Sequence, residues 1–142
     1  MFPAPLKRMI PMTNPPRILL VEDQNYARTR MRQTLEAKGY SVTAAATLND
    51  AYAHVCVKDL PYAAILCDYN LGGRNRTGLE LWQATRASRH SVPFIGSSSE
   101  MDYWQKVVEY GEDPLFHAIP KVDNMWDDTA ILAKLAELNI TP

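Results

Sequence analysis

Residues 65–73 read ILCDYNLGG, and within them Asp68 is a single carboxylate at the end of an apolar run. The residues just before it, 63–67, are Ala-Ala-Ile-Leu-Cys, a composition typical of a buried strand. A buried charge is costly unless another group pairs with it. Asp68 is therefore either an ordinary turn residue, since aspartate favours strand ends, or a carboxylate held at a strand tip for chemistry.

The rest of the chain alternates between short apolar stretches and amphipathic ones. The predicted strands span residues 17–21, 41–46, 62–67, 92–97 and 115–120. Apolar residues at helical spacing predict helices over residues 25–40, 47–60, 79–88, 100–111 and 127–140, and the glycine-containing stretch 72–78 is predicted to be a loop. A strand followed by a helix, five times over, predicts an α/β fold: a doubly wound parallel five-stranded sheet with helices on both faces.

The composition predicts one domain in the cytoplasm. Apolar residues make up 46% of the 142 and charged ones 22%, so residues 17–142 can bury one core. Five prolines in residues 1–16, MFPAPLKRMIPMTNPP, predict a disordered leader rather than a signal peptide. Without a secretion signal, Cys56 and Cys67 are predicted to stay reduced. A net charge of −1 and the lack of a long apolar stretch argue against partners such as nucleic acid or a membrane.

Polar side chains follow four of the five predicted strands: Glu22 and Asp23, then Asp68, then the serines 97–99, then Lys121. Because ligands of such folds bind beyond the carboxyl ends of the strands, we expect these groups to converge at one edge of the sheet. Three close carboxylates raise one another's pKa, and Mg²⁺ relieves that repulsion. An ammonium and a hydroxyl nearby suit an incoming phosphoryl group. The pattern predicts a carboxylate that accepts a phosphoryl group with the help of a metal.

At these residues the chain resembles the receiver domain of two-component response regulators, the chemotaxis-regulator-like family. The resemblance covers residues 17 to about 140 and rests on four motifs in order, LLVEDQ, ILCDYN, PFIGSSS and IPKV. The intervals from Asp23 to Asp68, on to Ser98 and on to Lys121 are 45, 30 and 23 residues, close to the family's usual spacing. The resemblance implies a flavodoxin-like (βα)5 fold, with the strand order 2-1-3-4-5 carried over from the family's chemotaxis member.

The resemblance also implies an acceptor and a metal site. Asp68 would take the phosphoryl group from a sensor histidine kinase or a histidine phosphotransfer protein. Glu22, Asp23 and Asp68, together with the backbone carbonyl of Asn70, would bind Mg²⁺ as the cofactor. Asp68 could also be an ordinary turn residue, but this interpretation is disfavoured because the other strand ends carry acidic, hydroxyl and lysine side chains that suit the same site.

Two further roles are implied for residues after the fourth and fifth predicted strands. Lys121 would form an ion pair with the phosphoryl group. A serine would hydrogen-bond a phosphoryl oxygen: the residues alone leave Ser97, Ser98 and Ser99 open, and the family pattern selects Ser98. Glu100 stands where the family tunes the rate of dephosphorylation.

The chain departs from the family pattern at three places. Val122 follows Lys121 where the family usually has a proline in a cis peptide, so we expect a trans bond and a shifted loop. Ala118 stands where the family often has a tyrosine or phenylalanine that links phosphorylation to the output face. Phe116, two residues back on the same face of the strand, could substitute for it, or that coupling is absent. The loop after Asp68 is longer than usual.

These features predict a single-domain receiver that ends at Pro142 and signals by protein contact. The expected output face comprises residues 100–111, 115–120 and 127–140, the expected oligomeric state is a monomer or weak dimer, and no enzymatic activity beyond the chain's own phosphorylation and dephosphorylation is expected.

Two other classes of protein compete with this prediction. One is a pseudo-receiver, a binding module that keeps the fold without a working switch, which the departures at Ala118 and Val122 favour. The other is a phosphatase of the haloacid dehalogenase type, which would need Asp-x-Asp after the first strand, where this chain has Glu22-Asp23-Gln24. Nucleotide binding is disfavoured because GGRNRTG lacks the Lys-Ser/Thr of a phosphate-binding loop.

Overall fold

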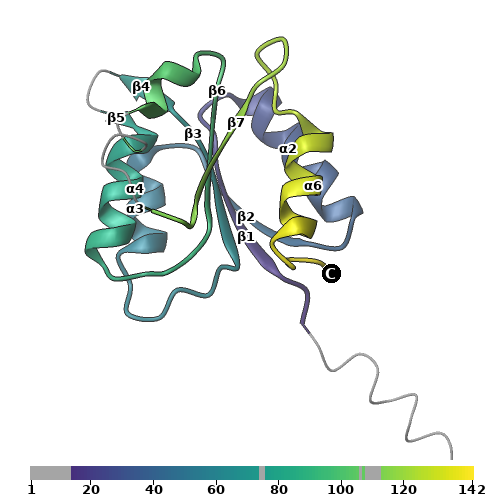
Figure 1. Ribbon diagram of the computed structural model, residues 1–142, viewed down its shortest axis with the longest axis horizontal. Helices are drawn as coiled ribbons and strands as arrows, with labels where there is room; N and C mark the ends of the chain where they lie inside the picture. Colours follow the sequence, from purple (N-terminus) through teal and green to yellow (C-terminus); the bar gives the residue numbers. More distant parts are fainter. Residues whose placement is uncertain (1–13, 74–75, 106, 108–112) are drawn as a thin grey trace, which may run out of the picture.

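The structure is a computed structural model and describes residues 14–73, 76–105, 107 and 113–142. Most of the predicted leader, residues 1–13, lies outside the described residues, and so does the greater part of the second half of the helix predicted over residues 100–111. The described chain forms a sheet with helices packed on its two faces (Figure 1).

The sheet has five parallel strands in the order β2-β1-β3-β6-β7, which is 2-1-3-4-5 when only the strands of this sheet are counted. The strands are β1 (Arg17–Val21), β2 (Ser41–Ala45), β3 (Ala64–Asp68), β6 (Phe94–Ser98) and β7 (Phe116–Pro120). In the register of the two central pairs, Val21 lies beside Cys67 and Asp68 lies beside Ser97. The predicted flavodoxin-like α/β fold and its strand order are confirmed.

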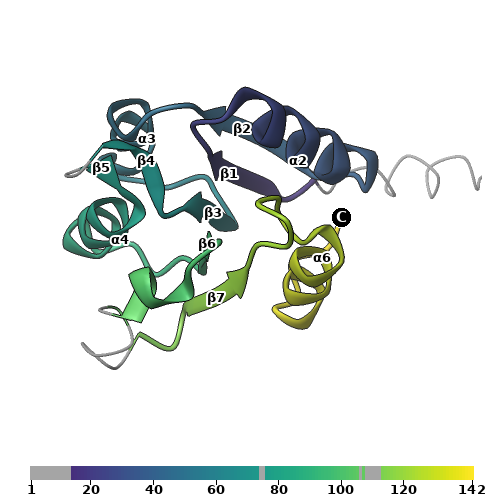
Figure 2. The same ribbon diagram turned by 90° about the horizontal axis from the view of Figure 1, so that it is seen from above.

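The helices lie on both faces of the sheet, as Figure 2 shows from above. One face carries α2 (Asn25–Ala37) and α6 (Asp128–Glu137), and the other carries α3 (Leu48–Val55) and α4 (Gly78–Ala87). The helix predicted from residue 100 begins as a short 3₁₀ turn, η2 (Met101–Trp104). Among the described residues, no helix combines the length and the apolar character that crossing a bilayer requires.

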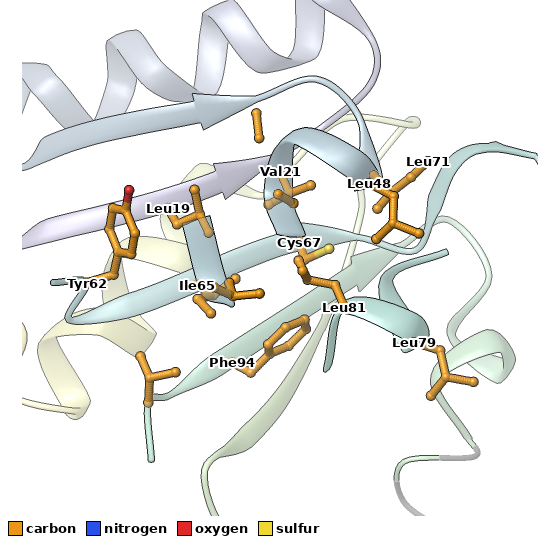
Figure 3. Close-up of a cluster of buried hydrophobic side chains, with 14 of the residues drawn as sticks. Leu19, Val21, Leu48, Tyr62, Ile65, Cys67, Leu71, Leu79, Leu81 and Phe94 are labelled. Carbon is orange, nitrogen blue, oxygen red and sulfur yellow. The ribbon is translucent and has the colours of Figure 1, made fainter. Parts of the chain in front are cut away.

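The apolar core is divided by the sheet into two clusters, because both faces of a parallel sheet are covered. Along β1, Leu19 and Val21 point into one cluster while Ile18 and Leu20 point into the other. Figure 3 shows the first cluster, in which Leu19, Ile65 and Phe94 lie together. Because these strands are buried on both faces, the place where polar side chains can gather is beyond the carboxyl ends of the strands.

The segment after Asp68, predicted to be a loop, differs from that prediction because it contains an antiparallel hairpin. Its strands are β4 (Asn70–Gly73) and β5 (Arg76–Thr77), with Asn70 opposite Thr77. Gly72 has a φ of 96°, in the left-handed region that favours glycine. Leu71 is 3% exposed and packs into the core, so the hairpin stands against the edge of the sheet that holds Asp68.

Candidate functional site

Three carboxylates meet at the carboxyl edge of the sheet. Glu22 and Asp23 follow β1 directly, and Asp68 is the last residue of β3, the neighbouring strand. One oxygen from each of these side chains lies within 4.8 Å of the others. Asp68 is buried, and Glu22 is fully buried. The convergence expected from the strand ends is therefore present in the folded chain.

Lys121, just beyond β7, supplies the positive charge of the site. Its ammonium Nζ donates a hydrogen bond to Glu22 Oε1 at 2.9 Å and lies 3.3 Å from Asp68 Oδ1. The lysine side chain is only 7% exposed. Burying an ammonium is tolerable only when carboxylates pair with it, and here two of them do.

The site carries more negative than positive charge, and its pKa values reflect this. Burial, followed by the charge of Glu22, raises the pKa of Asp68 to about 7, although Lys121 acts in the opposite direction. Burial and then Glu22 also raise the pKa of Asp23. Burial alone would lower the pKa of Lys121, but the charges of Asp68 and Glu22 outweigh it and the pKa is raised. A cation bound beside these acids would relieve their repulsion.

This charge imbalance predicts that Asp68→Asn stabilises the metal-free chain in a pH-dependent way. Folding raises the pKa of Asp68 from 3.8 to about 7, so this carboxyl group destabilises the folded chain. The loss of stability increases as the pH rises between those two values. At about 1.4 kcal/mol per pKa unit, the largest loss of unfolding free energy from this pKa shift is roughly 4 kcal/mol. Because the variant also loses the contact with Lys121, we expect a gain of about 2 kcal/mol at pH 8 and less than about 1 kcal/mol at pH 5, measured by urea unfolding in EDTA.

Asp113→Asn is the matched control for that measurement. Burial raises the pKa of Asp113, but hydrogen bonds from Arg86 and Trp82 outweigh it and the pKa is lowered. Its stabilising contribution is present above the unfolded pKa and is lost as pH falls, so the control should lose stability at pH 8. A loss of stability in Asp68→Asn as well would contradict the predicted repulsion.

The three serines after β6 differ in their hydrogen bonds. Ser97 Oγ donates to the carbonyl of Ile119 at 2.6 Å, and Ser99 Oγ donates to Asn124 Oδ1 at 2.6 Å. Ser98 Oγ accepts from the backbone N–H of Glu100 at 3.2 Å, and within the described part of the chain its hydroxyl donates to no acceptor. Ser98 is therefore the serine whose O–H is available to a ligand, which favours the family-based choice.

A cavity of about 480 Å³ opens above these residues. The predicted site residues that line it are Asp23, Asp68, Asn70, Ser98 and Lys121. Asn70, whose backbone carbonyl was predicted to bind the metal, is the first residue of β4 and lies at the cavity wall. The remaining predicted ligand, Glu22, is fully buried and does not line this cavity.

Aromatic side chains pack beside Asp68. The ring of Tyr69 stacks on Tyr103 with a centroid separation of 4.9 Å, and Tyr103 lines the cavity. Trp104 is 1% exposed and packs edge-on against Tyr69 at 5.1 Å. Gly78 permits this packing, because a Cβ there would lie 2.5 Å from Trp104 and 2.7 Å from the carbonyl oxygen of Asp68. The sequence offered no signal that Tyr103 would face the site.

The departures from the family pattern have structural counterparts. The bond between Lys121 and Val122 is trans, as predicted, and the chain then turns back on itself. Ala118 is exposed on β7. Phe116 is partly buried, with its ring centroid 5.4 Å from that of Trp104, so an aromatic contact does link β7 to η2.

Trp126 is a residue of the site that the sequence analysis missed. Its indole Nε1–H donates to Glu22 Oε1 at 3.0 Å. The two residues are far apart in the sequence, and neither periodicity nor a motif connects them. Only the folded chain brings Trp126 into contact with the carboxylate of Glu22.

Comparisons with known proteins agree with this geometry. The model of the response regulator receiver domain matches residues 18–121. A comparison with curated proteins finds no match. A CheY-like receiver domain protein from Methanospirillum hungatei JF-1 has a similar structure, with a TM-score of 0.70, 25% identity, and coverage of 87% of this chain and 93% of that one.

Two further solved structures share the fold. The signal receiver domain of an HD domain-containing protein from Pseudomonas fluorescens Pf-5 has a TM-score of 0.70 at 20% identity, covering 87% of this chain and 93% of that one. The response regulator TrrA from Thermotoga maritima, solved with Mg²⁺ and BeF, has a TM-score of 0.65 at 21% identity, covering 84% and 96%. With the family model spanning most of its length, this chain belongs to the response regulator receiver domain family.

Proposed function

We propose that this receiver domain accepts a phosphoryl group on Asp68 in a Mg²⁺-dependent reaction and signals through protein contacts. The observation that carries the proposal is the set of contacts around Asp68. Its carboxylate lies 3.3 Å from the ammonium of Lys121, beside two further acids and on the wall of a cavity that Ser98 also lines. A sensor histidine kinase or a histidine phosphotransfer protein is the proposed donor.

The chain's own groups suit this transfer. A carboxylate oxygen of Asp68 would form the new bond to phosphorus while the bond from phosphorus to the donor's leaving atom breaks. Lys121 would neutralise charge on the transferred oxygens, and the hydroxyl of Ser98 would donate a hydrogen bond to one of them. Burial holds these groups close together and partly excludes water, and the lower local dielectric constant strengthens each of these electrostatic interactions.

The residues present fit a magnesium ion. Oxygen ligands from a small number of carboxylates, completed by water, are what Mg²⁺ prefers. Asp23 and Asp68 line the cavity directly, and Asn70 lies at its wall. When bound, the ion would supply positive charge for the transferring phosphoryl oxygens.

The wider role follows from the same proposal. Output through the face of η2, β7 and α6 is proposed because the aromatic contact of Phe116 with Trp104 links β7 to a turn next to the cavity. A monomer or weak dimer, no catalysis beyond the chain's own phosphorylation and dephosphorylation, and a cytoplasmic location are parts of the proposal. The free thiols of Cys56 and Cys67 are consistent with a reducing compartment.

The proposal predicts a phosphoryl adduct that depends on Mg²⁺. Incubation with acetyl phosphate and Mg²⁺ should give one adduct by intact mass, and replacing Mg²⁺ with EDTA should remove it, because the three acids then repel the incoming anion. The absence of an adduct in both conditions, together with no response to beryllofluoride, would contradict the proposal and favour the pseudo-receiver.

A further inference from the structure

Trp126 lies in the segment between β7 and α6, and its contacts reach the centre of the site. The residue is 5% exposed. The indole N–H donates to Glu22 Oε1 at 3.0 Å, and the same oxygen accepts the hydrogen bond from Lys121 Nζ at 2.9 Å. The ammonium of Lys121 also lies 5.7 Å from the centre of the indole ring. Trp126 therefore contacts both partners of the Glu22–Lys121 ion pair.

A tight turn brings Trp126 to this position. The backbone N–H of Val122 donates to the carbonyl of Met125 at 2.8 Å, and the reverse bond is 3.0 Å long. Asp123 and Asn124, the two residues between them, have φ values of 51° and 62°, as a two-residue hairpin turn requires. Asn124 also accepts the hydrogen bond from Ser99. The turn reverses the chain directly after Lys121, so that Trp126 lies back against it.

Lys121 needs such support because a lysine side chain is flexible and has many rotamers. Of its two carboxylate partners, Asp68 is the group that changes during the proposed reaction. Glu22 is the other partner, and its carboxylate is fixed by two further donors, the indole of Trp126 and the backbone N–H of Gln24. Hydrogen bonds to a buried carboxylate are charge-assisted and strong. The position of Nζ beside Asp68 thus depends on how firmly Glu22 is held.

We propose that Trp126 is a positioning residue for phosphoryl acceptance: its indole N–H fixes the Glu22 carboxylate, which in turn holds the Lys121 ammonium against Asp68. The inference rests on the proposed function, in which Lys121 neutralises the transferred group. Trp126 itself touches no reacting atom.

The first test compares two indole hydrogen bonds in the same protein. Trp126→Phe keeps an aromatic ring and removes the N–H, and Trp82→Phe is the matched control, because the indole of Trp82 donates to Asp113 at 2.7 Å away from the site. We expect Trp126→Phe to slow phosphorylation by acetyl phosphate at saturating Mg²⁺ about five- to tenfold, which corresponds to the usual net contribution of one hydrogen bond. The control should stay within about twofold of wild type.

The second test needs neither metal nor phosphorylation. In EDTA, a double-mutant cycle combines Trp126→Phe with Glu22→Met, which keeps the length of the side chain and removes both acceptor oxygens, and reads the folding equilibrium constant from urea unfolding. If the indole acts through the Glu22 carboxylate, the two substitutions should be non-additive by about fivefold or more, whereas Trp82→Phe combined with Glu22→Met should be additive within about twofold.

The outcomes separate this inference from the function on which it rests. A folded Trp126→Phe chain that is phosphorylated at the wild-type rate would overturn the positioning role. So would an additive cycle, because the indole would then not act through Glu22. If wild type itself takes no phosphoryl group, the proposed function fails and the positioning role falls with it, while the cycle still reports whether the indole and Glu22 are coupled.

Discussion

Asp68→Asn is expected to abolish the phosphoryl adduct that the wild-type chain forms with acetyl phosphate and Mg²⁺. An amide oxygen is a far weaker nucleophile than a carboxylate oxygen, and asparagine supplies one metal-binding charge less. Because asparagine has nearly the shape of aspartate, the strand tip and its packing should remain. Intact mass measured over a time course would show the adduct in wild type and no adduct in the variant.

A surface aspartate provides the control for that experiment. Asp50 is exposed in the first turn of α3, so Asp50→Asn makes the same chemical change away from the cavity and should leave the adduct in place. An adduct that survives in Asp68→Asn would mean that another group is the acceptor. Asp23 would then be the next candidate, because it is a further carboxylate on the wall of the cavity.

Lys121→Met is expected to cost the metal-free chain about 3–5 kcal/mol of unfolding free energy at pH 8, the usual penalty for removing one partner of a buried ion pair. Methionine fills much of the volume of the lysine stem but leaves the fully buried Glu22 without its cation. It also removes the group that lowers the pKa of Asp68, so that pKa should rise above its present value of about 7. Urea unfolding in EDTA measures the loss.

The pH dependence of this loss has a definite sign. Asp68, with its pKa raised on folding, destabilises the chain increasingly as pH rises from its unfolded value through its folded value. The deficit of Lys121→Met should therefore be smaller at pH 5 than at pH 8. Lys134→Met is the control: its partner Glu137 is 68% exposed in an ion pair on α6, so the change should be less than about 1 kcal/mol. Equal losses in the two variants would contradict the argument.

The sequence was sufficient to predict the sheet and most of the site. Strands such as Arg17–Val21 and Ala64–Asp68 are short and almost continuously apolar, a pattern that identifies strands buried on both faces. Once the strands are known, a parallel topology places their carboxyl ends at one edge of the sheet. The proximity of four residues could therefore be predicted from the sequence: Glu22, Asp23, Asp68 and Lys121. These predictions depend on local periodicity and on one rule of chain topology.

Other features depended on contacts between distant parts of the chain. The hairpin of β4 and β5 was predicted to be a loop, because glycine and asparagine are typical of turns. The pairing of Asn70 with Thr77 is not signalled by any alternation of apolar and polar residues in these short strands. The choice among Ser97, Ser98 and Ser99 could not be made from composition. The folded chain favours Ser98, because the other two hydroxyls find acceptors on neighbouring segments, Ser97 at Ile119 and Ser99 at Asn124.

The sequence by itself determined where the strands lie along the chain and which chemical groups stand at their tips, because hydrophobic period acts over short stretches of chain, whereas the spatial order of the strands was expected only from the family resemblance. Only the tertiary structure decided how those groups are held. The indole of Trp126 reaches Glu22 because the turn at Val122–Met125 reverses the chain, and the carboxylate it contacts lies at the end of the first strand. A hydrogen bond of this kind depends on the positions of two atoms in space, and such positions are set by the packing of the whole domain.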